Sequence, residues 1–120
     1  MKIVTLNLNG IRSAAKKGFF EWMDAQEADI ICVQEVRAQE PELQNPHFFP
    51  NDYHAYFHFA EKKGYSGVGI YSRIKPKKVI KGLGFATADQ EGRHLAIDLG
   101  GLWISSLYMP SGTSGDLRQT

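Results

Sequence analysis

The first 36 residues read as strand, helix and strand, and this pattern limits the fold more than any other feature of the sequence. Residues 2–8 form a strand-like stretch whose side chains alternate between two faces and which ends in polar groups. Residues 11–27 carry apolar side chains at mostly helical spacing and predict one helix, which Gly18 could interrupt. Residues 28–33 are a short run rich in isoleucine and valine, typical of a strand buried on both faces. The sequence therefore predicts a right-handed βαβ unit within an α/β fold.

Polar side chains stand where the two predicted strands end. Parallel strands bring their carboxyl ends to one edge of a sheet, so Asn7 and Glu35 should lie side by side there, with Asn9 nearby. A carboxylate in this place is a metal ligand, a general base or a solvated residue that ends the strand. Asn9-Gly10 could equally form only the turn into the helix. Both interpretations stay open, and the Mg²⁺ interpretation predicts that the Asn7 and Glu35 side chains approach within roughly 5 Å.

The composition is that of an ordinary globular domain. With 42% hydrophobic and 22% charged residues, the 120-residue chain falls outside the disordered and collagen-like classes. It contains no long apolar run and no secretory leader, so we expect a cytoplasmic protein without a membrane span. The one cysteine, Cys32, lies inside an apolar strand and is expected to fill core space. No repeat or linker divides the chain.

The remaining sequence predicts strands rather than helices. Residues 38–51 contain three prolines and predict a loop with one helical turn near residues 41–44. Further strands are expected at residues 53–59, 66–72, 77–81, 94–99 and 102–108. The first two of these should be antiparallel neighbours, and Gly100-Gly101 predicts a hairpin between the last two. Apolar strands such as 30–33 and 103–108 would then lack cover, so the chain looks like part of a larger domain.

Basic and glycine-rich segments could face phosphate. Between Lys62 and Lys81 stand seven lysines or arginines and no acidic residue, which makes this block a candidate phosphate-facing surface. Residues 64–69 are rich in glycine but lack the lysine of a P-loop, and their glycines would allow close approach of a ligand or a strand. Arg93 and Tyr108 suit phosphate contacts, although a solvated arginine and a hydroxyl at the core edge explain them equally well.

Five segments together resemble a known family. They are Leu-Asn-Leu-Asn-Gly-Ile-Arg at 6–12, Val-Gln-Glu at 33–35, Gly-Tyr-Ser-Gly-Val-Gly at 64–69, Glu-Gly-Arg at 91–93 and Leu-Tyr-Met-Pro at 107–110. In order and spacing they resemble the exonuclease III family of apurinic/apyrimidinic endonucleases, within the endonuclease/exonuclease/phosphatase superfamily. This resemblance implies a four-layer α/β sandwich with two central β-sheets flanked by helices. Residues 1–120 would be the N-terminal half of that single domain, with no internal boundary.

The resemblance also implies roles for the matching residues. Glu35 and Asn7 would bind the catalytic Mg²⁺, with Mn²⁺ possible, and Tyr108 would join them as a catalytic residue that faces the scissile phosphate. The DNA-binding residues would be Asn9, Arg12, Lys62, Lys63, Gly64, Tyr65, Ser66, Gly67 and Arg93. In the family, an aspartate and a histidine that activate water belong to later motifs, of the kinds Gly-Asp-x-Asn and Ser-Asp-His. Neither motif occurs before Thr120.

The activity so implied is metal-dependent hydrolysis of DNA in base-excision repair. The partner would be double-stranded DNA, cut 5′ to an abasic site or cleared of 3′ blocks and nucleotides. The chain alone is expected to be inactive without the C-terminal half of the domain. Two alternatives stay open: a noncatalytic nucleic-acid-binding or complementing fragment, and another phosphodiesterase of the same superfamily. Residues 64–69 and 91–93 favour the DNA repair branch.

Overall fold

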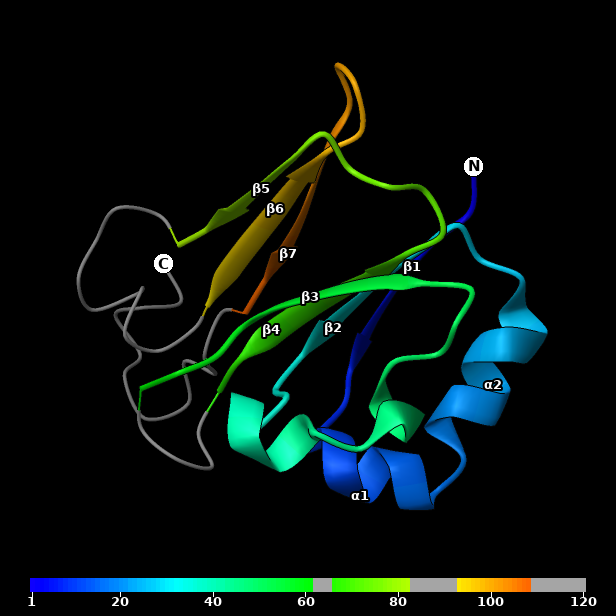
Figure 1. Ribbon diagram of the computed structural model, residues 1–120, viewed down its shortest axis with the longest axis vertical. Coiled ribbons are helices and arrows are strands. Elements are labelled where there is room, and N and C mark those ends of the chain that lie inside the picture. The colour runs from blue at the N-terminus through cyan, green and yellow to red at the C-terminus, as the bar shows by residue number, and fades with distance from the viewer. Residues whose placement is uncertain (62–65, 83–92, 109–120) are drawn as a thin grey trace, which may run out of the picture.

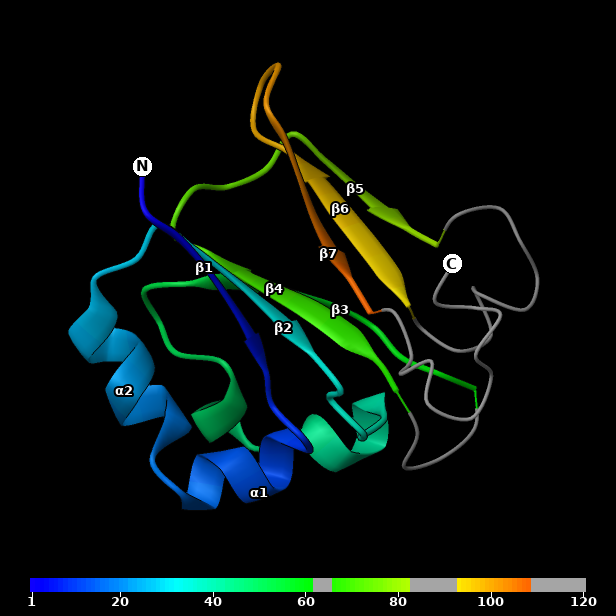
Figure 2. The ribbon, with the colours of Figure 1, turned by 180° about the vertical axis from the view of Figure 1, so that it is seen from behind.

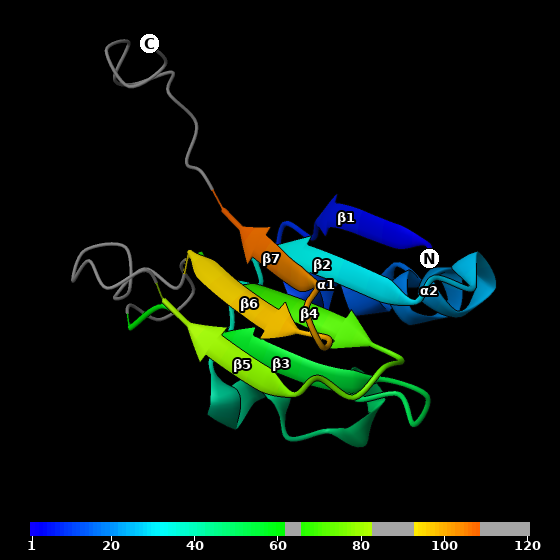
Figure 3. The same cartoon turned by 90° about the horizontal axis from the view of Figure 1, so that it is seen from above.

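Two β-sheets and a set of helices on one of them make up the part of the chain that the computed structural model describes, which is residues 1–61, 66–82 and 93–108 (Figure 1). Sheet A has the strand order β1 (Ile3–Asn7), β2 (Ile30–Gln34), β4 (Val68–Ser72), β3 (His54–His58). Sheet B has the order β5 (Lys78–Lys81), β6 (His94–Asp98), β7 (Trp103–Leu107), and it stacks on sheet A (Figure 3). The helices are α1 (Ile11–Lys16), α2 (Phe19–Gln26) and the short 3₁₀ helices η1 (Glu40–Leu43) and η2 (Pro46–Phe48). The predicted α/β class with two central sheets is confirmed.

The predicted βαβ unit is present, and its helix is divided. β1 and β2 pair in parallel, with Asn7 opposite Gln34 at the carboxyl ends. α1 ends at Lys16 and α2 begins at Phe19, with Gly18 between them at a φ of 95°. Glycine adopts this left-handed conformation without steric cost, so Gly18 breaks the helix at the expected position. In the described part of the chain, no helix is long and apolar enough to cross a membrane.

The later strands form two antiparallel groups. β4 pairs antiparallel with both β2 and β3 and therefore lies inside sheet A, which confirms the expected pairing of β3 with β4. β6 and β7 form the expected antiparallel pair on either side of Gly100 and Gly101. The backbone amides of both glycines donate to the Asp98 carboxylate. Donation from Gly101 and Gly100 lowers the pKa of Asp98 and fixes this turn.

Two apolar cores lie on the two faces of sheet A, because successive strand residues point in opposite directions. Ile31 and Val33 of β2 belong to the core under the helices. Ile30 and Cys32 belong to the core between the two sheets. β2 is thus buried on both faces, as predicted. The expectation that the strand at residues 30–33 lacks cover is wrong, because sheet B supplies its second face.

Sheet B leaves its outer face exposed among the described residues. In β7, Ile104 and Ser106 are buried against sheet A, while Trp103 and Leu107 on the other face are 46% and 44% exposed. Ile80 of β5 is 47% exposed. For β7, the expected lack of cover is therefore confirmed in the part of the chain that is described.

Cys32 lies in the core between the sheets and is 3% exposed. Burial raises the pKa of its thiol to about 11. The nucleophilic form of cysteine is the thiolate, which is scarce at neutral pH when the pKa is this high. Cys32 therefore fills core space, as its place in the sequence indicates.

Gly69 provides a test of this packing. It lies in β4 opposite Val33 and Phe57, and a Cβ there would lie 2.6 Å from Phe57 Cδ1 and 3.1 Å from Val33 Cγ2. Gly69→Ala is expected to lower the free energy of unfolding by about 1–3 kcal/mol, because overpacking forces neighbouring side chains from their rotamers. Urea denaturation of wild-type and variant proteins measures the loss. In a Phe57→Leu background the substitution should cost less, and an equal cost in both backgrounds would contradict the clash.

Candidate active site

The carboxyl ends of β1 and β2 bring Asn7 and Glu35 into contact at one edge of sheet A. Asn7 Nδ2 donates a hydrogen bond to Glu35 Oε2 at 2.5 Å. Backbone pairing continues past the strand ends, since the amide of Leu8 donates to Gln34 at 2.9 Å and that of Gly10 to Glu35 at 2.8 Å. The predicted approach of the two side chains is therefore confirmed, and parallel pairing of their strands is the cause.

A left-handed backbone turns Glu35 toward Asn7. In a continued extended strand, Glu35 would share the helix-covered face with Val33, whereas Asn7 lies on the opposite face. Glu35 instead has a φ of 51°, and Asn9 and Arg37 have similar values of 50° and 52°. This conformation costs a residue other than glycine roughly 1–2 kcal/mol. Such residues cluster at functional sites, where the surrounding structure holds them in place.

Arg37 is the second partner of Glu35, and the sequence motifs did not identify it. Its Nη2 pairs with Glu35 Oε1 at 2.5 Å, so that Asn7 and Arg37 each occupy one carboxylate oxygen. The Glu35 side chain is 15% exposed and the Arg37 side chain 46%. The available signal was a basic residue two positions after a candidate carboxylate. That spacing did not reveal the contact, because side-chain direction after the strand depends on the left-handed turns.

A basic pocket adjoins the carboxylate. Arg12 Nη1 forms an ion pair with Glu42 Oε2 at 2.7 Å, and Arg12 Nη2 donates to the carbonyl oxygen of Arg37 at 3.3 Å. Arg12, Lys16 and Arg37 line a surface pocket of about 450 Å³. Three cationic side chains around one hollow favour an anionic ligand such as a phosphate. The structure therefore places the predicted residue Arg12 next to the Glu35 segment.

Ser66 and Gly67 are bonded to the segment that carries Glu35. The amide of Val36 donates to Gly67 at 3.0 Å, and the amide of Arg37 donates to Ser66 at 2.7 Å. Gly67 has a φ of 93°, and a Cβ there would lie 3.3 Å from that of Val36, so this close approach favours glycine. The other expected DNA-binding residues of this loop lie outside the described residues: Lys62, Lys63, Gly64 and Tyr65.

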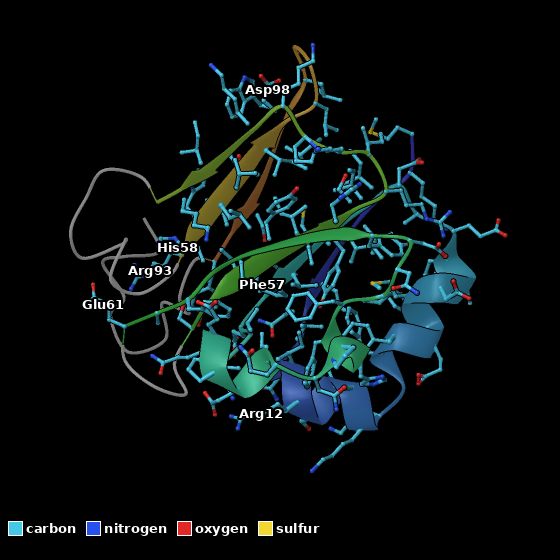
Figure 4. The ribbon with its side chains drawn as sticks, viewed as in Figure 1. Arg12, Phe57, His58, Glu61, Arg93 and Asp98 are labelled. Carbon is cyan, nitrogen blue, oxygen red and sulfur yellow. The ribbon has the colours of Figure 1, made fainter. Side chains whose placement is uncertain are left out.

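Arg93 and Tyr108 lie together at one end of sheet B. Arg93 directly precedes β6, Tyr108 directly follows β7, and the amide of Tyr108 donates to the carbonyl oxygen of Arg93 at 2.8 Å. Nδ1 of His58 is hydrogen-bonded to the carbonyl oxygen of His94 at 2.9 Å, which joins this end of sheet B to β3. Figure 4 shows Arg93 and His58 at this end and Asp98 at the opposite end.

The Tyr108 end of sheet B is also the Glu35 end of sheet A. Ser106 Oγ donates to the carbonyl oxygen of Val33 at 2.9 Å. Gln34 Nε2 donates to Ser106 Oγ at 3.1 Å, so side chains next to the site connect the two sheets. The structure thus gathers Asn7, Glu35 and Tyr108 at one end of the molecule.

Glu35 is the carboxylate that contacts Asn7 and Arg37 at this end. Within residues 1–61, 66–82 and 93–108, no group of three or more histidine, cysteine, aspartate or glutamate side chains could hold a metal ion. Mg²⁺ fits the donor that is present, because it prefers oxygen ligands and is commonly held by one or two carboxylates together with waters and substrate phosphates. Glu35 supplies the carboxylate oxygens. Asn7 supports them through Nδ2, while its Oδ1 accepts the amide of Asn9 at 2.9 Å.

Comparison with known proteins agrees with this arrangement. The chain is 36% identical over 116 residues to an exodeoxyribonuclease of Bacillus subtilis, and 32% identical over 116 residues to a DNA-(apurinic or apyrimidinic site) endonuclease of Dictyostelium discoideum. These alignments cover 96% of this chain and 45% and 32% of those proteins. The structure of an AP endonuclease from Archaeoglobus fulgidus matches with a TM-score of 0.82 and 30% identity, over 99% of this chain and 46% of that one. The chain therefore spans less than half the length of these relatives.

A match along most of the chain identifies its family. Residues 4–103 match the Endonuclease/Exonuclease/phosphatase family. The matched region includes the ends of β1 and β2 at Asn7 and Glu35, the loop at Gly67 and strands β3 to β6. The chain therefore belongs to the endonuclease/exonuclease/phosphatase family.

Proposed function

We propose that this chain is the N-terminal half of a metal-dependent DNA phosphodiesterase that cuts 5′ to abasic sites or removes 3′ blocks and nucleotides. The observation that carries the proposal is the Glu35 carboxylate, held by Asn7 and Arg37 at a sheet edge beside a basic pocket. A module that only binds DNA has use for the pocket but not for a carboxylate beside it, because that charge repels phosphate. Similarity to proteins named for apurinic or apyrimidinic sites supports the choice of substrate.

Each residue of this site has a distinct task in the proposed reaction. Asn7 and Arg37 hold Glu35 in one orientation through its two oxygens. A divalent metal ion bound at Glu35 would stabilise the negative charge that develops on the phosphate and the leaving oxygen. Arg37 is half-exposed and can turn from Glu35 to a DNA phosphate while Asn7 keeps the carboxylate in place. Tyr108 would contact the scissile phosphate from the side of sheet B.

The DNA backbone would lie across the basic side of the site. Arg12, Lys16 and Arg37 surround the pocket. Arg93 lies at the end of sheet B that also carries Tyr108. Lys62 and Lys63, which lie outside the described residues, would add further phosphate contacts. Contacts of this kind go to phosphates, so they position the duplex without reading its bases. Recognition would then depend on the lesion rather than on the surrounding sequence.

The test uses the full-length protein and a duplex with one abasic-site analogue. We expect a single break 5′ to the lesion, lost on chelation by EDTA and restored by Mg²⁺ or Mn²⁺. The same duplex with an intact nucleotide is the matched control, and a duplex with a 3′-phosphate tests removal of 3′ blocks. Binding to both duplexes without cleavage under every metal condition would favour the noncatalytic alternative. Hydrolysis of lipid or inositol phosphates but not of DNA would favour another phosphodiesterase.

A further inference from the structure

We infer that Gln34 is a positioning residue that fixes the two halves of the candidate site relative to each other. One half is Glu35 on sheet A, and the other is Tyr108 at the end of sheet B. Gln34 directly precedes Glu35, and its side chain connects the two sheets. The inference rests on the proposed function and identifies the side chain that aligns the Glu35 and Tyr108 halves of the site.

The Gln34 amide reaches both sheets at once. Its Nε2 donates to Thr5 Oγ1 of β1 at 3.1 Å and to Ser106 Oγ of β7 at 3.1 Å. A glutamine amide has two N–H donors, so both are used here. One side chain on β2 therefore ties the neighbouring strand of its own sheet to a strand of the other sheet.

Ser106 is both an acceptor and a donor in the hydrogen bonds that connect the two sheets. It is 1% exposed, and its Oγ donates to the carbonyl oxygen of Val33 at 2.9 Å. A hydroxyl has one hydrogen to donate, so Ser106 Oγ accepts from Gln34 while it donates to Val33. Loss of either side chain's polar group leaves a buried partner without its hydrogen bond, which carries a desolvation penalty.

Apolar contact alone cannot provide the same alignment. Most of the described interface between β2 and sheet B is the core that contains Ile30, Cys32 and Ile97. The hydrogen bond of His58 to the carbonyl oxygen of His94 joins the sheets at β3 instead. Apolar burial is non-directional, so it holds two faces together without fixing how one lies along the other. The hydrogen bonds of Gln34 and Ser106 are directional and lie at the end where the site is.

Gln34 and Ser106 are close in sequence to Glu35 and Tyr108, so the alignment of the two sheets also sets the relative positions of Glu35 and Tyr108. Glu35 is one residue beyond Gln34, and Tyr108 is two residues beyond Ser106. A displacement at the Gln34–Ser106 bond is therefore passed to Glu35 and Tyr108 through three residues in all. A misplacement of about 1 Å can cost about a hundredfold in rate.

The test compares Gln34→Met and Ser106→Ala in the full-length protein on the abasic duplex. Each variant is expected to lower kcat by about ten- to a hundredfold. KM should stay near the wild-type value, because the basic pocket is untouched. The double variant should be no slower than the slower single variant, since both substitutions remove the same hydrogen bond.

Ser72→Ala is the matched control. Ser72 is also a fully buried serine, and its Oγ donates to the carbonyl oxygen of Ile74, but it lies at the far end of β4 from Val68 and the site. It should lose stability to a similar degree and keep the wild-type kcat. If Gln34→Met and Ser106→Ala behave like Ser72→Ala, with lower stability and unchanged kcat, the positioning role is overturned.

Amide hydrogen exchange gives a second readout that does not depend on activity. The amide of Tyr108 bonds to the carbonyl oxygen of Arg93. Its exchange should become about tenfold faster in Gln34→Met and Ser106→Ala and stay unchanged in Ser72→Ala. If the wild-type protein cleaves no phosphodiester, the proposed function fails, and this exchange decides whether Gln34 fixes the end of β7. Unchanged exchange at Tyr108 would overturn the inference.

Discussion

Replacing Glu35 with glutamine is expected to lower kcat/KM for abasic-site cleavage by about a hundred- to a thousandfold, the loss seen when a preorganised electrostatic group is removed. Glutamine keeps the shape of the side chain and can still accept the hydrogen bond from Asn7. It offers no negative charge to Arg37 or to a metal ion. The fold should persist, because Glu35 lies outside both apolar cores. Steady-state cleavage and circular dichroism measure the two effects.

Asp98→Asn is the control for that substitution. Asp98 is also a carboxylate with defined partners, Gly100 and Gly101, but it lies at the opposite end of sheet B (Figure 4). Its replacement should weaken the hairpin turn and leave kcat/KM unchanged. Mg²⁺-dependent cleavage at the wild-type rate by Glu35→Gln would rule out the catalytic and metal-binding role.

Residues 1–120 on their own are expected not to cleave abasic DNA at any Mg²⁺ concentration, and to self-associate. Hydrolysis at neutral pH needs a positioned base and a complete metal site, and the described residues contain no group of three or more histidine, cysteine, aspartate or glutamate side chains that could hold a metal ion. Trp103, Leu107 and Ile80 expose apolar surface on the outer face of sheet B. Among the strands that the structure describes, β1 and β7 lie at the edges of their sheets (Figure 2), and unpaired strand edges pair readily with other chains.

Sedimentation velocity, a hydrophobic dye and the abasic duplex assay test this expectation together. The isolated chain should sediment as oligomers, bind the dye and show no cleavage. Addition of a fragment with the remainder of the domain should reduce dye binding and restore cleavage. A monomeric and fully active 120-residue protein would overturn both the half-domain proposal and the catalytic assignment.

The sequence by itself determined the elements that depend on local pattern. Periodicity was enough to find β1, the broken helix at Gly18, β2 and the hairpin at Gly100-Gly101. Parallel pairing across the βαβ unit then required Asn7 and Glu35 to meet, because two parallel strands end at the same sheet edge. These conclusions need only neighbouring residues and one rule of strand connection.

Only the tertiary structure decided which elements meet across long distances. The sequence shows that β2 is apolar on both faces, but apolar faces attract without direction, so it could not show that sheet B covers one of them. The position of β4 between β2 and β3 was equally hidden. The contact of Arg37 with Glu35 depends on left-handed turns, and that of Gln34 with Ser106 joins residues 72 positions apart. Such contacts depend on side-chain directions that are set by left-handed backbone turns and by the packing of the sheets, and the periodicity of the sequence does not encode these directions.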